Sequence, residues 1–163
     1  MKAFFRSALI ALVFFVAARA GVAQAVRVGT FDKASTVVAF YGSPLWSAQL
    51  KAKGAELQDA KRINDRKKID ELNRWGSDSQ ELAHKQLAGA APLDNILTML
   101  KPLFPEVAAR AHVAMIVPEL EWTDSSVATV DVTDLLLDQL QATPRTRKIV
   151  EELRRSSKLG PSK

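Results

Sequence analysis

The two histidines, His84 and His112, are the side chains that would most easily bind a metal ion or carry a proton. They lie 28 residues apart and form no HxxxH or HExxH pattern. His84 falls on a polar stretch, where a surface position is expected. His112 lies beside an apolar stretch, where a helix end or core edge explains it. The histidines therefore predict no metal site.

The nucleophilic side chains likewise give no sign of a catalytic site. Ser43 and Ser47 lie close to Trp46, but neither has the GxSxG setting of an activated serine. Ser43 is explained as a helix cap, because Pro44 follows it. The chain has no cysteine and no glycine-rich phosphate-binding loop. We therefore expect a protein that is not an enzyme and takes no cofactor.

Carboxylates gather in the last third of the chain, and together they offer oxygen ligands for a divalent cation. Asp131 and Asp134 lie three residues apart, but their spacing matches no EF-hand loop. Asp131 is expected instead to cap the helix that follows it. The acidic residues upstream are explained by a polar loop in which their carboxylates are solvated; they are Glu119, Glu121 and Asp124. No metal site is predicted.

The first 25 residues have the pattern of an export signal. Lys2 and Arg6 precede an unbroken apolar run, Ala8 to Ala18, and Ala23-Gln24-Ala25 has the small-x-small form of a cleavage site. The run is about half the length needed to cross a bilayer. We expect cleavage near Ala25 and a periplasmic or secreted product; an uncut N-terminal anchor is the alternative.

The net charge of +5 is mostly a property of the chain ends. The signal removes three basic residues and no acid, so the remainder carries +2. Residues 145–163 hold seven basic and two acidic residues, on a helix predicted over about 144–158. This basic tail is either a solvated helix end or a surface for anionic lipid. Its central members are Arg145, Arg147, Lys148, Arg154 and Arg155.

Short β-branched segments predict a small sheet in one α+β domain over 26–163. Residues 26–31 alternate, 113–117 form a continuous apolar run typical of a buried strand, and 127–130 give a third candidate. Residues 34–41 fit either a strand or a short helix. The expected fold is a sheet of about three strands with packing C-terminal helices.

A helical hairpin is predicted over about 44–91, inserted between the strands. Ser43-Pro44 provides a helix start, and 45–74 is rich in helix formers with sparse apolar residues. Gly76–Ser79 reads as the turn, and residues 80–91 as the helix that returns antiparallel to the first. A helix this polar should project, with one narrow coiled-coil-like seam.

The segment after the hairpin is more apolar. Its periodicity over 93–108 predicts a core-facing helix. Pro102 and Pro105 should break or kink it near Lys101–Pro105.

The seam and the tryptophans are the candidate contact surface. Trp46 is expected at the base of the hairpin and Trp75 at its tip, where each either packs or anchors an apolar partner. The basic cluster Lys61–Lys68 is interleaved with acids and lacks alternating aromatics, so nucleic acid is not expected. The candidate contact residues are Trp46, Leu57, Ile63, Ile69, Leu72 and Trp75.

The order of elements resembles the Skp/OmpH family of periplasmic chaperones. The matching features are a strand ending at Asp32, Ser43-Pro44 before a long polar helix, the strand Met115–Val117, and Val130–Asp134 opening a helix. The resemblance implies a small β body that carries helical arms and holds unfolded polypeptides. The chain departs from the family in its shorter, nearly neutral arm and its extra C-terminal helix.

These observations favour an exported, non-enzymatic protein that binds unfolded or outer-membrane polypeptides through the hairpin. A homo-oligomer is compatible with this prediction. The alternative is an envelope-associated structural or adaptor protein that applies its basic C-terminal helix to an anionic membrane surface or acidic partner. A small hydrolase or ligand-binding protein is the third hypothesis, and it would need a pocket that the sequence does not reveal.

Overall fold

The computed structural model describes residues 26–120 and 122–158, so the predicted signal over 1–25 and Glu121 lie outside it. No helix among these residues is both long enough and apolar enough to cross a membrane. The elements follow in this order: β1 Arg27–Thr30, α1 Lys33–Tyr41, α2 Pro44–Arg62, α3 Arg66–Leu87, α4 Asp94–Leu100, the 3-10 helix η1 Lys101–Leu103, α5 Phe104–Ala111, β2 Met115–Val117, β3 Ala128–Asp131, α6 Thr133–Gln139 and α7 Pro144–Lys158.

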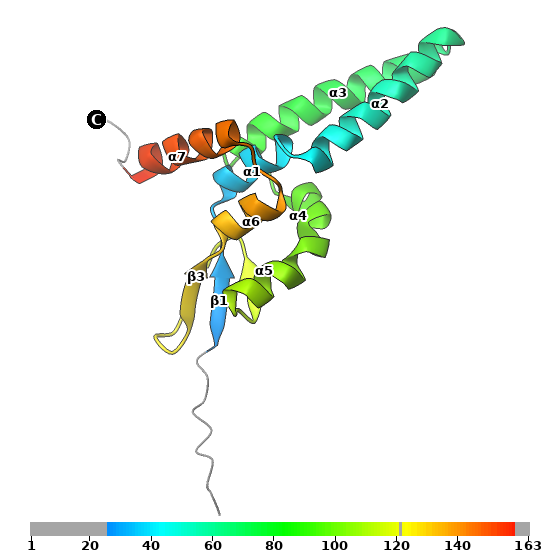
Figure 1. Cartoon of the computed structure of the whole chain (residues 1–163). Coiled ribbons are helices and arrows are strands. Elements are labelled where there is room, and N and C mark those ends of the chain that lie inside the picture. Colours follow the sequence, from blue (N-terminus) through cyan, green and yellow to red (C-terminus); the bar gives the residue numbers. More distant parts are fainter. Residues whose placement is uncertain (1–25, 121, 159–163) are drawn as a thin grey trace, which may run out of the picture.

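The described strands form one parallel sheet in the order β2-β1-β3, with the helices gathered above and beside it (Figure 1). Val28 pairs with Met115 on one side and with Thr129 on the other. Gly29, the next residue, faces the core, where a Cβ would lie 3.1 Å from Val132. The predicted α+β class and three-stranded sheet are confirmed.

Residues 34–41, which fitted either a strand or a helix, form α1. The reason is local, because the side chain of Asp32 accepts a hydrogen bond from the Ser35 amide at 2.6 Å and so caps the helix. Phe40 is fully buried on this helix. The core consists of apolar side chains from the helices and from the ends of the strands, chiefly Phe31, Val37, Phe40, Ile96, Leu100, Val107, Val132, Leu136, Leu137, Leu140 and Val150.

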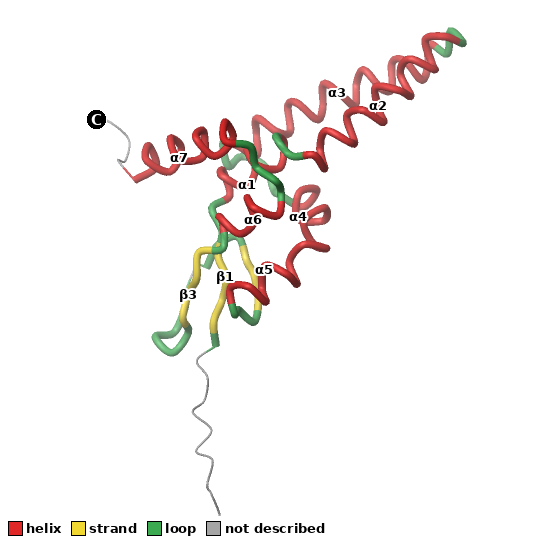
Figure 2. The backbone as a smooth tube through the Cα atoms, viewed as in Figure 1, coloured by secondary structure: helices red, strands yellow, loops and turns green. Residues whose placement is uncertain are grey.

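α2 and α3 form a hairpin that projects away from this body (Figure 1). Lys68 lies 3.9 Å from Glu56, and Trp75 stacks on Trp46, so α3 returns beside α2. The loop at its tip is short (Figure 2). Ser43 caps α2 as predicted, since its Oγ accepts the Trp46 amide at 3.3 Å.

The predicted position of the turn is wrong. The first helix ends at Arg62 rather than near residue 74, and Gly76–Ser79 lies inside α3. Asn64 supplies the left-handed residue that the reversal needs, with φ of 56°, and Asp65 caps α3 by accepting the Lys68 amide at 3.0 Å. Asn and Asp are common turn residues, and Gly76 takes an ordinary place inside α3.

The proline-containing segment behaves as expected near Lys101–Pro105, where η1 separates α4 from α5. The predicted buried strand is different. β2 begins at Met115 and lies at an edge of the sheet, and Met115 is 52% exposed. An apolar run identifies a strand but does not show whether its outer side is covered.

The C-terminal part packs onto α1. Asp131 ends β3, and Val132 rather than Asp131 occupies the N-cap of α6, which corrects the predicted cap. The Asp131 carboxylate still accepts the Thr133 amide at 2.8 Å. α7 packs against α1 through side chains that include Val150, which is 2% exposed.

Candidate functional site

The hairpin is the most exposed part of the described chain. α2 buries Ala60, and α3 buries Leu72 and Gln86; nearly all other positions of these helices are partly or fully exposed. Ile63, at the tip, is 69% exposed. An exposed β-branched apolar side chain at the end of a projecting arm is available to a partner.

The predicted contact residues separate into two groups. Leu57 and Ile69 are half-buried and Leu72 is buried, so they hold the two helices together and offer little surface. Ile63 is at the tip and free to make contacts. The placement of Trp75 at the tip is wrong, because the turn lies at residues 63–65 and Trp75 is in the middle of α3.

Trp46 and Trp75 meet near the base of the hairpin. Their ring centroids are 5.9 Å apart with an interplanar angle of 30°, and Tyr41 meets Trp46 edge-on at 5.0 Å. Both tryptophans are half-buried. They line a depression of about 500 Å³, the root groove, between the hairpin and α4. Its other linings are Phe40, Tyr41, Gln49, Ser79, Leu82, Asp94, Asn95, Thr98 and Met99.

Gln86 fixes the hairpin to the body. Its side chain is 2% exposed, its Oε1 accepts the Tyr41 hydroxyl at 2.9 Å, and its Nε2 donates to the Pro92 carbonyl at 2.7 Å and to Asn95 Oδ1 at 2.5 Å. One buried amide thus joins α1, α3 and the start of α4. The sequence offered no signal for this role, since a glutamine on a polar helix is indistinguishable from a surface residue.

Ion pairs along the hairpin moderate its charge. Lys68 pairs with Glu71 at 2.7 Å, and this hydrogen bond raises the pKa of Lys68 and lowers that of Glu71. Lys85 pairs with Glu81 at 2.6 Å and lowers the pKa of that carboxyl. These exposed pairs contribute little to the stability of the hairpin.

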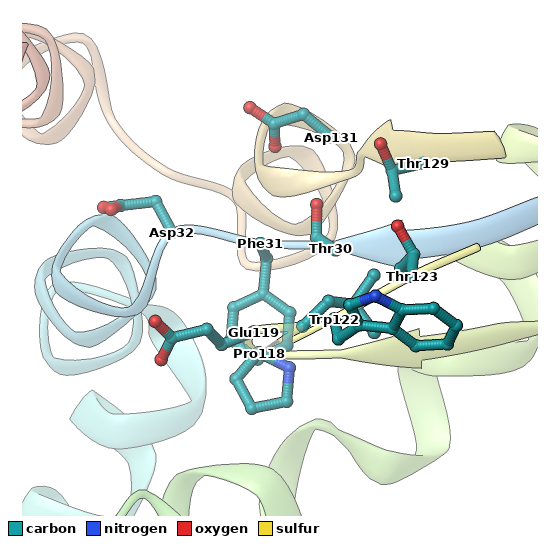
Figure 3. A pocket seen from close by; sticks show the side chains of 10 residues that line it. Thr30, Phe31, Asp32, Pro118, Glu119, Trp122, Thr123, Thr129 and Asp131 are labelled. Carbon is teal, nitrogen blue, oxygen red and sulfur yellow. The ribbon is translucent and has the colours of Figure 1, made fainter. Parts of the chain in front are cut away.

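A second depression of about 530 Å³, the strand-end pocket, lies at the carboxyl end of the sheet (Figure 3). Parallel strands commonly bind ligands at this edge. The indole of Trp122, 79% exposed, lies at one end of it, and the carboxylates of Asp32 and Glu119 lie at the other (Figure 3). The remaining linings are Thr30, Phe31, Pro118, Leu120, Thr123, Thr129 and Asp131.

The carboxylates of this region are engaged separately. Within the described residues, no group of three or more acidic or histidine side chains could hold a metal ion. Glu119 forms an ion pair with Lys33, whose hydrogen bond lowers the pKa of Glu119. Asp131 accepts hydrogen bonds from Thr133, and Asp134 lies 3.2 Å from Arg154. Asp124 accepts the Ser126 amide, which lowers the pKa of that carboxyl.

The basic tail is only partly available to a partner. Arg147 lies 2.7 Å from Asp138, and Arg154 turns toward α6, so these two cations are neutralised within the molecule. Arg155 pairs with Glu151 along its own helix at 3.4 Å. Arg145 and Lys148 are exposed. The tail offers a smaller positive surface than its sequence indicates.

The histidines lie apart from these depressions. His84 is exposed on α3, as predicted. His112 ends α5 with a left-handed backbone, φ 52°, which matches the predicted helix-end position. Ser47 is exposed on α2, without a base beside it in the sequence.

The positions of the sequence-predicted residues are therefore mixed. The structure brings Trp46 and Trp75 together and isolates Ile63 at the tip, while Leu72 is enclosed.

A scan against models of protein families, a search of the curated proteins and a search of the solved structures each find no match to this chain.

Proposed function

We propose that this is an exported, non-enzymatic protein that binds unfolded polypeptides, including those destined for the outer membrane, through its helical hairpin. The observation that carries the proposal is the projecting hairpin, with an exposed Ile63 at its tip and the Trp46–Trp75 pair in a groove at its base. The order of elements, which resembles that of the Skp/OmpH chaperones, supports the same function.

Binding would be driven by burial of apolar surface and would remain reversible. Covering about 200 Å² of aromatic surface contributes about 5 kcal/mol at roughly 25 cal/mol per Å², before the entropy of association is subtracted. The remainder corresponds to a weak complex. The mixed charges of the hairpin keep its surface in solution between binding events.

The test is suppression of client aggregation. An unfolded outer-membrane polypeptide is diluted from urea, and light scattering is followed with and without the purified protein. Ile63→Ser should weaken the suppression about twofold or more, since it removes an apolar side chain that is worth about 1 kcal/mol or more on burial. Ile149→Ser, on α7, is the matched control because Ile149 is also exposed, at 39%.

Two results would contradict the proposal. The first is a wild-type protein that leaves aggregation unchanged. The second is an equal loss of aggregation suppression in the Ile63 and Ile149 variants, which would mean that the client-binding surface is not confined to the hairpin and includes the C-terminal helix.

A further inference from the structure

Two further depressions on the body lie next to the root groove or next to each other, as their shared lining residues show. A third depression of about 350 Å³, the helix-side depression, lies beside α4 and α5. It shares Asp94 and Thr98 with the root groove, and it shares Phe31 and Pro118 with the strand-end pocket. The three therefore adjoin one another through shared side chains, and we call their combined lining, from the base of the hairpin to the carboxyl end of the sheet, the track.

Each of the three depressions is lined by both apolar side chains and at least one carboxylate. Trp46 and Trp75 lie at one end, Leu97 and Phe104 in the middle, and Trp122 at the other end. Large exposed apolar patches are uncommon on monomeric proteins and often mark an interaction site. An extended chain that presents apolar side chains at intervals would cover these positions in turn.

The charges of the track select among such chains. Four carboxylates line it and one amine, Lys101, does so; the carboxylates are Asp32, Asp94, Glu119 and Asp131. Glu119 is paired with Lys33, and Asp131 lies 4.0 Å from Arg154. Asp94, at the junction of two depressions, forms no ion pair within the described part of the chain. Asp32 and Asp94 therefore remain against one amine, Lys101, and this small excess of negative charge favours a basic partner.

One buried polar atom beside the root groove has no hydrogen-bond partner within the described part of the chain. It is the Oε1 of Gln49, a residue that lines the groove. A buried acceptor without a partner is unfavourable, because it has lost its hydrogen bonds to water. Because this oxygen is buried, a peptide N–H of an occupant would reach it only where the groove opens around the occupant.

We infer that the track binds an extended polypeptide segment in which aromatic or aliphatic residues alternate with lysine or arginine. This inference rests on the proposed function and adds the client's chemistry. The hairpin would meet a client first, and the track would hold the segments that suit its aromatic and acidic lining.

The test measures the binding of fluorescein-labelled peptides to the purified protein by anisotropy. The first probe is an eight-residue peptide of alternating Phe and Lys, and the two matched probes alternate Phe with Glu and Ser with Lys. The Phe-Lys peptide should bind about tenfold more tightly than either. A Phe-Glu peptide that binds equally well would overturn the inference.

Variants at the junction distinguish the track from other surfaces. Thr98 is exposed and lies one helical turn from Asp94. Thr98→Lys places a cation beside that carboxylate, so it should weaken Phe-Lys binding about tenfold, whereas Thr98→Glu should leave it unchanged or tighter. Asn73→Lys, at an exposed position of α3, is the control with the same change of charge.

The outcomes separate the two proposals. If Thr98→Lys and Thr98→Glu lose the same affinity for the Phe-Lys peptide, or if Asn73→Lys loses as much as Thr98→Lys, the track does not select peptides by their charge. If the Thr98 variants leave peptide binding unchanged while Ile63→Ser still lowers aggregation suppression, the track inference fails and the hairpin proposal stands. If the wild-type protein does not suppress aggregation but binding of the Phe-Lys peptide still depends on residue 98, the hairpin proposal fails and the track inference stands.

Discussion

The body and the hairpin of this protein are stabilised in different ways. In the body, Phe40, Ile96 and Leu136 have no exposed surface. In the hairpin, α2 and α3 have 19 and 22 residues, and only three of these are buried. The body therefore depends on close packing, while the hairpin depends on helix propensity, capping and a thin seam. The difference teaches that one chain can combine a fixed scaffold with a surface that is free to make contacts.

The largest expected effect is in the body core. Leu136→Ala should lower the free energy of unfolding by about 2–5 kcal/mol, because it opens a cavity that the packed helices cannot close. Leu50→Ala, at a position of α2 that is 46% exposed, should change it by about 0.5 kcal/mol or less. Urea unfolding followed by circular dichroism measures both. Similar losses would show that the hairpin is as tightly packed as the body.

A glycine in the sheet gives the next effect. A Cβ at Gly29 would lie 3.1 Å from Val132, 3.2 Å from Ile116 and 3.3 Å from Val113. Gly29→Ala should therefore destabilise the protein by about 1–3 kcal/mol through overpacking. Thermal unfolding measures the loss. An unchanged melting temperature would mean that the sheet moves away from the helices at little cost.

The hairpin glycines should show the opposite sign. A Cβ at Gly54 or Gly76 would meet nothing within 4 Å. Gly54→Ala and Gly76→Ala should each stabilise the hairpin by about 0.5–1 kcal/mol, because alanine restricts the unfolded chain and fits a helix. Hydrogen exchange of the α2 and α3 amides reports the gain locally. Slower exchange in the body but not in the hairpin would contradict it.

The smallest effect concerns the ion pair between Lys33 and Glu119. The hydrogen bond from Lys33 lowers the pKa of Glu119 in the folded protein, so the pair stabilises above the unfolded pKa of about 4.3 and is lost as the pH falls through the folded value. Lys33→Met should raise the pKa of Glu119 toward its ordinary range in an NMR titration. The pKa of Glu81, paired with Lys85, should stay low.

The sequence predicted those features that depend on local chemistry. Ser43-Pro44 identified the start of α2 because a cap and a proline act within one turn. The prolines at 102 and 105 located the break between α4 and α5 for the same reason. Alternation over 26–31, an apolar run over 113–117 and β-branched composition over 127–130 identified the strands and so the α+β class.

Features that depend on distant partners could not be read in this way. Small residues such as those of Gly76–Ser79 often break isolated helices, but contacts made by Leu72 and Trp75 hold α3 through that stretch. The burial of Gln86 arises from Tyr41, Pro92 and Asn95, which lie on other elements. The track is likewise formed by elements far apart in the chain.

The sheet has a consequence for the order of events during synthesis. Its central strand is synthesised first. The Asp32 amide after it donates a hydrogen bond to the Thr133 hydroxyl, which is synthesised 101 residues later. The hairpin closes over a much shorter separation, with Glu56 near Lys68. A nascent chain therefore forms its helical arm while both edges of β1 are still unpaired. Until β2 and β3 emerge, that strand is open to pairing with any other extended chain nearby.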